Sequence, residues 1–205
     1  MTSTATGVAS PTVAQKIGLW FAHVYVLGMC GVLLGGFIVQ FGESEYPCPL
    51  CLIQRMFMML TALGPAYFIA RSRSGPVSTR DFATGYGMSI IAALAGAAVS
   101  ARQILLHILP GDPGYGGKVL GLSLYTWALI TFLLAALTSA ANLLLITEFE
   151  PGASRSRLLS TITLSVLAVV VLANLLASCA LQGFHWFLPD DPTRYQLFHD
   201  LGLTP

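Results

Sequence analysis

Residues 46–55 read YPCPLCLIQR, and this stretch decides the fold because a short polar loop gives way here to a long apolar run. Cys48 and Cys51 are separated by two residues. If a helix begins at Leu50, Cys51 lies in its first turn, where unpaired backbone N–H groups and the positive end of the helix dipole favour a thiolate. Arg55 follows one turn later on the same face. The sequence therefore predicts a dithiol at the start of a helix, beside a cation.

The composition is that of a membrane protein. Hydrophobic residues make up 55% of the 205 residues and charged residues only 9%, whereas soluble domains carry about 25% charged residues. A helix that crosses a bilayer needs roughly 20 mostly apolar residues. Five stretches meet this requirement, at about 17–41, 50–70, 83–109, 119–147 and 158–182. We therefore predict an all-α, polytopic membrane bundle that forms one domain over residues 1–205 and ends in a tail at 183–205.

The basic residues predict how the bundle is oriented, because lysine and arginine favour the cytoplasmic side. They concentrate before the first stretch and in the second and fourth connections, at Lys16, Arg71, Arg73, Arg80, Arg155 and Arg157. We expect a cytoplasmic N-terminus, and a dithiol and C-terminal tail on the periplasmic side of a bacterial inner membrane, where disulfides persist. The net charge of +1 indicates no nucleic-acid partner.

Small residues recur every four positions in two of the stretches and predict close approach of neighbouring helices. They are Gly31 and Gly35 in the first stretch, and Ala92, Gly96 and Ser100 in the third.

A single C-x-x-C motif is compatible with a redox dithiol, with half of a four-ligand zinc site, or with two unrelated thiols. Zinc needs two further ligands, but the chain has no second C-x-x-C. The position beside Arg55 favours redox chemistry, and we predict no metal site. Cys30 lies roughly 18 Å below the outer end of the first helix and is expected to be inert. Nothing in the sequence decides whether Cys179, near the outer end of the fifth helix, faces Cys51.

Arg55 and Arg102 are costly charges within predicted membrane helices. Arg102 lies eight residues before Pro110, about 12 Å below the outer end of the third helix. No acidic residue lies in any of the five stretches, so a carbonyl-bearing ligand between the helices is an attractive partner for two buried cations. Arg55 could instead snorkel to the surface. His107 is either a proton donor or acceptor at this ligand or an ordinary interface residue.

The tail from residue 183 onward has two parts. Residues 184–187, FHWF, predict an interfacial aromatic belt. Asp191 and Pro192 predict the N-cap and first position of a short helix over 193–200. The tail and the third connection either form a lid or docking surface beside the dithiol or only cover helix ends.

These residues resemble the bacterial disulfide bond formation protein B (DsbB) family, membrane enzymes that pass electrons from a thioredoxin-like periplasmic oxidant to a quinone. The specific part of the match is the C-x-x-C-x-x-x-R pattern from Cys48 to Arg55. Residues 102–110, RQILLHILP, are similar to the end of the family's third span, with His107 where glutamine is common. The resemblance covers about residues 17–147 in topology.

The resemblance implies a four-helix core, here followed by a fifth helix, and a role for each site residue. Cys51 is expected to contact the quinone, ubiquinone or menaquinone, and Arg55 to help bind it. Cys48, expected nearer water, exchanges with the disulfide of a DsbA-like partner. From the argument on buried cations we place Arg102 and His107 at the same cofactor site. We therefore expect a membrane thiol:quinone oxidoreductase that supports disulfide bond formation in periplasmic proteins and contacts membrane lipid.

Two features depart from the family pattern. Typical members have four spans, and they carry a second cysteine pair in the third connection, whereas residues 110–122 contain no cysteine. Three hypotheses stay open: a shortened relay within this chain, a half-enzyme served by a separate protein that supplies the missing pair, and a non-catalytic assembly subunit with a structural or vestigial dithiol.

Overall fold

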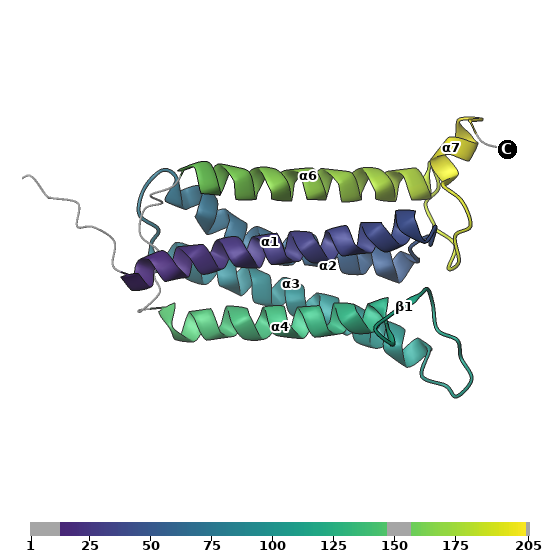
Figure 1. Ribbon diagram of the computed structural model, residues 1–205, viewed down its shortest axis with the longest axis horizontal. Coiled ribbons are helices and arrows are strands. Elements are labelled where there is room, and N and C mark those ends of the chain that lie inside the picture. The colour runs from purple at the N-terminus through teal and green to yellow at the C-terminus, as the bar shows by residue number, and fades with distance from the viewer. Residues whose placement is uncertain (1–12, 147–156, 204–205) are drawn as a thin grey trace, which may run out of the picture.

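The computed structural model describes residues 13–146 and 157–203, and within them five long helices form a bundle (Figure 1). All five are long and apolar enough to cross a membrane. They are α1 (Val13–Gly42), α2 (Pro49–Ser72), α3 (Thr79–Leu106), α4 (Leu124–Leu144) and α6 (Arg157–Gln182). The predicted all-α, polytopic membrane bundle is confirmed, and the predicted limits of α1, α2 and α6 agree with the structure to within a few residues.

The bundle is built from neighbouring pairs of helices. Helix α3 packs between α2 and α4, while α1 packs against α2 and α6. Helices α2 and α3 approach closely where Gly64 faces Gly85. Only glycine fits at these two positions, because a Cβ on either residue would collide with the other's backbone. Gly96 lies under the ring of Phe132, as the small-residue pattern of the third stretch predicts. The prediction of a close helix contact at Gly31 is wrong, since a Cβ there would meet no atom of a neighbouring element within 4 Å.

Helix α3 ends at Leu106 rather than at residue 109. Its start is fixed by a capping box, in which Ser78 Oγ accepts the Asp81 N–H at 3.1 Å. Its end comes early because Pro110 disfavours helical geometry in the residue before it. His107 is the C-cap, and its ring bonds forward to Asp112 at 3.2 Å. The last turn of the predicted third span is therefore part of the connection.

The fourth span begins at Leu124, so the predicted start at residue 119 is wrong. Residues 118–123 form a hairpin of β1 (Lys118–Val119) and β2 (Leu122–Ser123). Leu120 and Gly121 make its turn with φ values of 52° and 82°, the sign pattern of a type I′ turn. The predicted end at residue 147 lies outside the described residues.

The tail contains one short helix, α7 (Gln196–Asp200), whose N-cap is Tyr195. The prediction that Asp191 caps a helix beginning at residue 193 is wrong. The tail is held instead by the other end of α7, where the Asp200 carboxylate accepts the Phe184 N–H at 3.1 Å. This contact folds the tail back onto the end of α6 (Figure 1).

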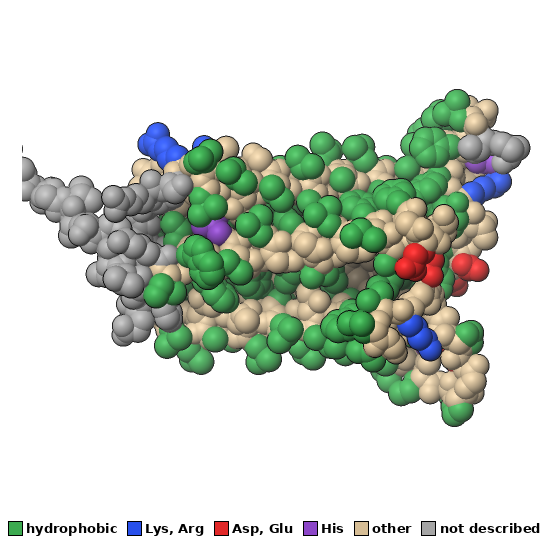
Figure 2. Space-filling model, in the orientation of Figure 1, with side chains coloured by type: hydrophobic (Ala, Val, Ile, Leu, Met, Phe, Trp, Pro, Cys, Tyr) green, Lys and Arg blue, Asp and Glu red, His purple; other side chains and the backbone are tan. Residues whose placement is uncertain are grey.

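Charged groups divide between the two ends of the bundle. Glu43 and Glu45 follow the end of α1, and Figure 2 shows acidic side chains gathered at that end. Arg71 and Arg73 lie at the opposite end, where α2 finishes. Arg155 lies outside the described residues. The orientation relative to the cytoplasm stays a prediction.

Candidate active site: a dithiol beside an apolar cavity

The two thiols lie at the start of α2, as the sequence predicts. Cys48 is the N-cap, with φ −69° and ψ 165°, and Pro49 takes the first helical position. The Cys48 Sγ accepts the Cys51 N–H at 3.2 Å. A proline at this position loses no hydrogen bond, because its N–H would be unpaired in any case. Local sequence therefore accounts for the position of both sulfurs.

The exposure of the two thiols is the reverse of the prediction. Cys48 is 5% exposed, while Cys51 is half-buried and lines a cavity. The expectation that Cys48 is nearer water is wrong, because its sulfur turns back over the first turn of α2. Two causes raise the pKa of the Cys48 thiol. The larger is its interaction with the Cys51 side chain, and the second is burial.

A buried pair of amides holds the dithiol from the side of α3. Gln103 is 1% exposed, and its Nε2 lies 3.3 Å from the Cys48 sulfur and 3.7 Å from the Cys51 sulfur. Gln54 Nε2 donates to Gln103 Oε1 at 2.8 Å, which leaves the Gln103 N–H groups to face the sulfurs. Sequence reasoning missed both residues. The available signal was a polar side chain in each of two apolar helices, three residues after Cys51 in α2 and next to Arg102 in α3.

The guanidinium of Arg55 is bound by α1. Nη1 donates to Gln40 Oε1 at 2.6 Å, and Nη2 donates to the Gly36 carbonyl at 3.0 Å. The guanidinium carbon lies 5.4 Å from the centroid of the Phe37 ring, a cation–π distance. Arg55 thus has protein partners without an acidic residue, since an amide and a backbone carbonyl serve in place of a carboxylate.

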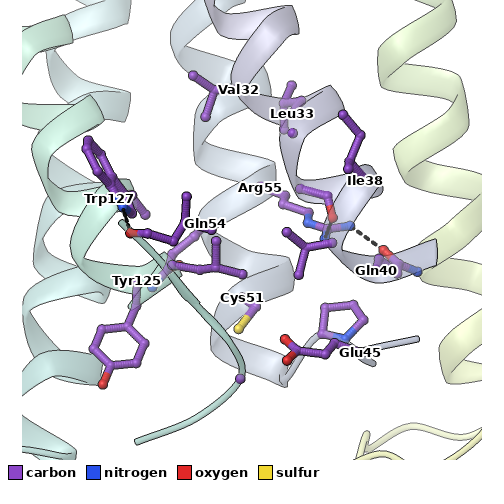
Figure 3. Close-up of a pocket in the computed structure, with 18 of the residues that line it drawn as sticks. Val32, Leu33, Ile38, Gln40, Glu45, Cys51, Gln54, Arg55, Tyr125 and Trp127 are labelled. Atoms are coloured by element: carbon purple, nitrogen blue, oxygen red, sulfur yellow. Dashed lines mark hydrogen bonds between the residues drawn. The ribbon is translucent and has the colours of Figure 1, made fainter. Parts of the chain in front are cut away.

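A cavity of about 430 Å³ lies beside Cys51. Its wall comes from α1, α2, the loop before Cys48, the third connection and α4, and it is mostly apolar. Figure 3 shows Cys51 between Glu45, Arg55 and Tyr125, with Trp127 on the far side. Ligand sites in proteins commonly have a volume in this range, a mostly apolar wall and a few polar groups. The cavity therefore has the character of a site for a mostly apolar molecule with a few polar groups.

The third connection is fastened to the loop that precedes the dithiol. Tyr115 Oη donates to the Tyr46 carbonyl at 2.7 Å, and the Gly117 N–H donates to Glu45 Oε2 at 2.8 Å. Asp112 shapes the same connection, and the Gly114 N–H lowers the pKa of its carboxyl group. The Tyr115 and Gly117 contacts hold the third connection against the loop that leads into Cys48.

Arg102 and His107 do not line the cavity. Arg102 is exposed, so the expectation of a buried cation is wrong there. Successive residues on a helix point about 100° apart, and α3 turns Gln103 rather than Arg102 toward the thiols. His107 is half-buried, and its ring stacks on Tyr125 with centroids 5.8 Å apart. A cofactor-binding role for Arg102 and His107 stays a prediction.

The other two cysteines lie apart from the motif. Cys30 is buried in the core, 2% exposed, as predicted for an inert thiol. Cys179 is exposed on α6. All four cysteines fall within the described residues, and each is a free thiol. The structure brings together Cys48, Cys51 and Arg55 and leaves Cys179 outside this group.

Five helices of membrane-spanning length, with a dithiol beside an apolar cavity at one end, define a multi-pass membrane protein with a thiol site. Residues 19–116 match the model of the family described as "Disulfide bond formation protein DsbB". The matched part runs from α1 to the third connection, nearly half of the chain, and is similar to the DsbB family. Helices α4, α6 and α7 follow that part.

Individual relatives agree with the family match. "Disulfide bond formation protein B" of Burkholderia pseudomallei is 27% identical over 143 residues, covering 55% of this chain and 82% of the relative. "Disulfide bond formation protein B 2" of Burkholderia lata is 29% identical over 155 residues, covering 61% and 88%. A Chromobacterium violaceum relative is 38% identical over 88 residues, covering 42% of this chain and 51% of the relative. No solved structure matches the chain.

Proposed function

We propose that this chain is a membrane thiol:quinone oxidoreductase that supports disulfide bond formation in periplasmic proteins. The observation that carries the proposal is the asymmetry of the dithiol, since Cys51 lines an apolar cavity while Cys48 is buried at the start of α2 against Gln103. The five helices serve as one membrane domain of a bacterial inner membrane, with the dithiol on the periplasmic side. The family and the relatives' names support this reading.

The cavity fits a quinone ring in size and chemistry. Its volume of about 430 Å³ exceeds that of one aromatic ring, and its wall is mostly apolar. Arg55 supplies fixed N–H groups at the wall and Cys51 supplies a sulfur. A quinone bound there, ubiquinone or menaquinone, would accept two electrons and two protons and leave the pair of thiols as a disulfide. The other lining residues include four with amide or carboxylate side chains, Gln40, Glu43, Glu45 and Gln54.

Exchange with a soluble partner takes place at Cys48. The partner is a reduced DsbA-like, thioredoxin-fold protein, and its thiolate attacks Cys48 of the Cys48–Cys51 disulfide. The bond between Cys48 and Cys51 breaks, a mixed disulfide forms at Cys48, and Cys51 leaves as a thiolate. The start of α2, the Gln103 N–H and the Arg55 charge stabilise that thiolate. The partner's second thiolate then attacks the mixed disulfide, which releases oxidised partner and reduced Cys48.

Serine substitutions test the scheme. Purified Cys48→Ser and Cys51→Ser variants are expected to lose quinone reduction driven by a reduced thioredoxin-fold protein, because neither can form the internal disulfide. Cys179→Ser is the matched control, since its thiol is exposed and outside the site. Quinone reduction at the normal rate in Cys51→Ser would contradict the proposal.

The third connection favours a second candidate, a half-enzyme. Residues 110–122 carry no cysteine, so a separate protein can supply the second cysteine pair that delivers electrons. The Cys51→Ser variant tests this, because Cys48 then keeps any partner as a stable mixed disulfide. Capture of a thioredoxin-fold oxidant supports direct exchange, whereas capture of a different protein with a cysteine pair supports the half-enzyme.

A further inference from the structure

The tail returns to the site through Tyr195. Its hydroxyl accepts the Gln40 Nε2 hydrogen bond at 2.9 Å. Its ring stacks on Phe41, with centroids 6.4 Å apart and 14° between the planes, and meets Tyr46 edge-on at 5.3 Å. Tyr195 therefore contacts both the end of α1 and the loop that leads into Cys48.

Gln40 transmits this contact to Arg55. The Gln40 side chain is 4% exposed, so each end of its amide needs a protein partner. Its Nε2 is taken by Tyr195, and its Oε1 accepts Arg55 Nη1 at 2.6 Å. Loss of the Tyr195 hydroxyl would leave a buried N–H group unpaired, and the amide could pair it only by turning away from the guanidinium. Figure 3 shows the Gln40–Arg55 contact at the edge of the cavity.

The position of Tyr195 is itself fixed by the end of α6. Gly183 ends that helix with φ +62°, and a Cβ there would meet Asp200 and the backbone of Gln196. Asp200 accepts the Phe184 N–H and the Gln196 amide at 3.1 and 3.0 Å. The turn after α6 and α7 thus form one fastened unit that carries Tyr195. This unit lies outside residues 19–116, the part that matches the family.

We propose that Tyr195 is a positioning residue that acts through Gln40 to hold the Arg55 guanidinium at the cavity wall, so that the fifth helix and the tail are a working part of the thiol site. This positioning role extends the function proposed above, and its expected effect on quinone turnover rests on that proposed function. Its geometric content, the placement of a cation beside Cys51, does not depend on a quinone.

The experiment uses Tyr195→Phe, which keeps the ring and its stacking but removes the hydroxyl. Tyr67→Phe is the matched control, because Tyr67 also donates a side-chain hydrogen bond, to Asp81 at 2.8 Å, but at the other end of the bundle. In full-length protein carrying Cys48→Ser, the rate of Cys51 alkylation is measured with anionic iodoacetate and with neutral iodoacetamide. The ratio of the two rates reports the positive charge near Cys51.

Tyr195→Phe is expected to lower the iodoacetate:iodoacetamide ratio by about threefold or more, the effect of one lost hydrogen bond to the amide that holds the cation. Tyr67→Phe should leave the ratio unchanged. In a Gln40→Leu background, Tyr195→Phe should have no further effect, because the route to Arg55 is already broken. A merely structural role would not give this non-additivity. An unchanged ratio in Tyr195→Phe, or equal effects with and without Gln40, overturns the proposal.

Turnover separates this inference from the proposed function. With Cys48 intact, Tyr195→Phe should raise the KM for decylubiquinone about three- to tenfold with a smaller change in kcat. If the unsubstituted protein reduces no quinone but the alkylation ratio falls in Tyr195→Phe, the positioning role stands and the proposed function fails. If the unsubstituted protein reduces quinone but the ratio is unchanged in Tyr195→Phe, the proposed function stands and the positioning role fails.

Discussion

The amide pair beside the thiols gives the sharpest prediction for the chemistry of the site. Gln103→Leu replaces a 1%-exposed side chain whose Nε2 lies 3.3 Å from the Cys48 sulfur and 3.7 Å from the Cys51 sulfur. The change removes an N–H donor aimed at the place where negative charge develops when the disulfide opens. It also leaves the buried amide of Gln54 without the acceptor it now has.

The structure indicates the size of both effects. Hydrogen bonds to charged groups contribute about 1.5–3 kcal/mol, and the long contact to Cys51 with a weak sulfur acceptor places this one at the low end. A loss of about 1.4 kcal/mol in the transition state slows disulfide opening roughly tenfold. The unpaired Gln54 amide costs about 1–3 kcal/mol of folding stability. Both rate and stability should therefore fall in Gln103→Leu.

The double variant Gln54→Leu/Gln103→Leu separates the two effects. Removing both partners of a buried hydrogen bond is often nearly neutral for stability, so the double variant should unfold at nearly the same denaturant concentration as the unsubstituted protein. It still lacks the donor to the sulfurs. The rate of disulfide opening, measured by stopped flow with excess dithiothreitol on oxidised protein, should stay about tenfold low.

The outcome that refutes this reasoning is recovery of the rate together with stability. If Gln54→Leu/Gln103→Leu opens its disulfide as fast as the unsubstituted protein, Gln103 serves packing alone. A normal rate in the single variant Gln103→Leu refutes it as well. Gln182, whose amide bonds the His185 carbonyl at the end of α6, offers a control glutamine. Gln182→Leu should leave the rate of disulfide opening unchanged.

Three further predictions concern the connection, the tail and the helix packing. Tyr115→Phe removes a bond that fastens the third connection, so Cys48 should react about two- to tenfold faster with a bulky maleimide; an unchanged rate would show that the connection does not cover it. The Phe184 N–H and its neighbours lower the pKa of Asp200, so its contribution is complete above about pH 4 and is lost as pH falls through the lowered pKa; protection of the tail amides against hydrogen exchange, taken relative to their intrinsic rates, should fall there, and in Asp200→Ala it should be low at every pH. Gly96→Leu should cost about 1–3 kcal/mol by overpacking against the neighbouring helix, seen as a lower denaturation midpoint, and an unchanged midpoint would contradict the close contact.

Hydropathy predicted the number of membrane helices because a bilayer sets their length regardless of how they pack. It failed at residues 118–123, where Val119, Leu120 and Leu122 continue the apolar run but belong to a hairpin. A turn with two positive φ values does not show in hydropathy when its first residue is leucine. The error came from reading apolar character as helix.

The site was predictable where local chemistry decides it. The N-cap position of Cys48 and the place of Cys51 in the first turn follow from the residues on either side. Local sequence does not decide whether Arg102 or Gln103 faces the thiols, because this depends on which face α3 turns toward α2. The burial of Cys48 likewise depends on α3, which places Gln103 against both sulfurs. Both facts belong to the packing between helices, which a single sequence specifies only indirectly.

The third connection makes packing contacts in this chain at the place where typical family members carry a second cysteine pair. Typical relatives are expected to use this connection to carry electrons, but here Tyr115 and Gly117 bind it to the loop before Cys48. We expect a bulky partner to open these bonds when it reaches Cys48, whereas Cys51 lines the cavity. The two sulfurs thus have different surroundings. Cys51 faces an apolar cavity, and Cys48 is buried. We therefore expect a partner that exchanges at Cys48 to displace the connection, a step that adds to the chemistry of disulfide opening and leaves the effect of Gln103 on that chemistry in place.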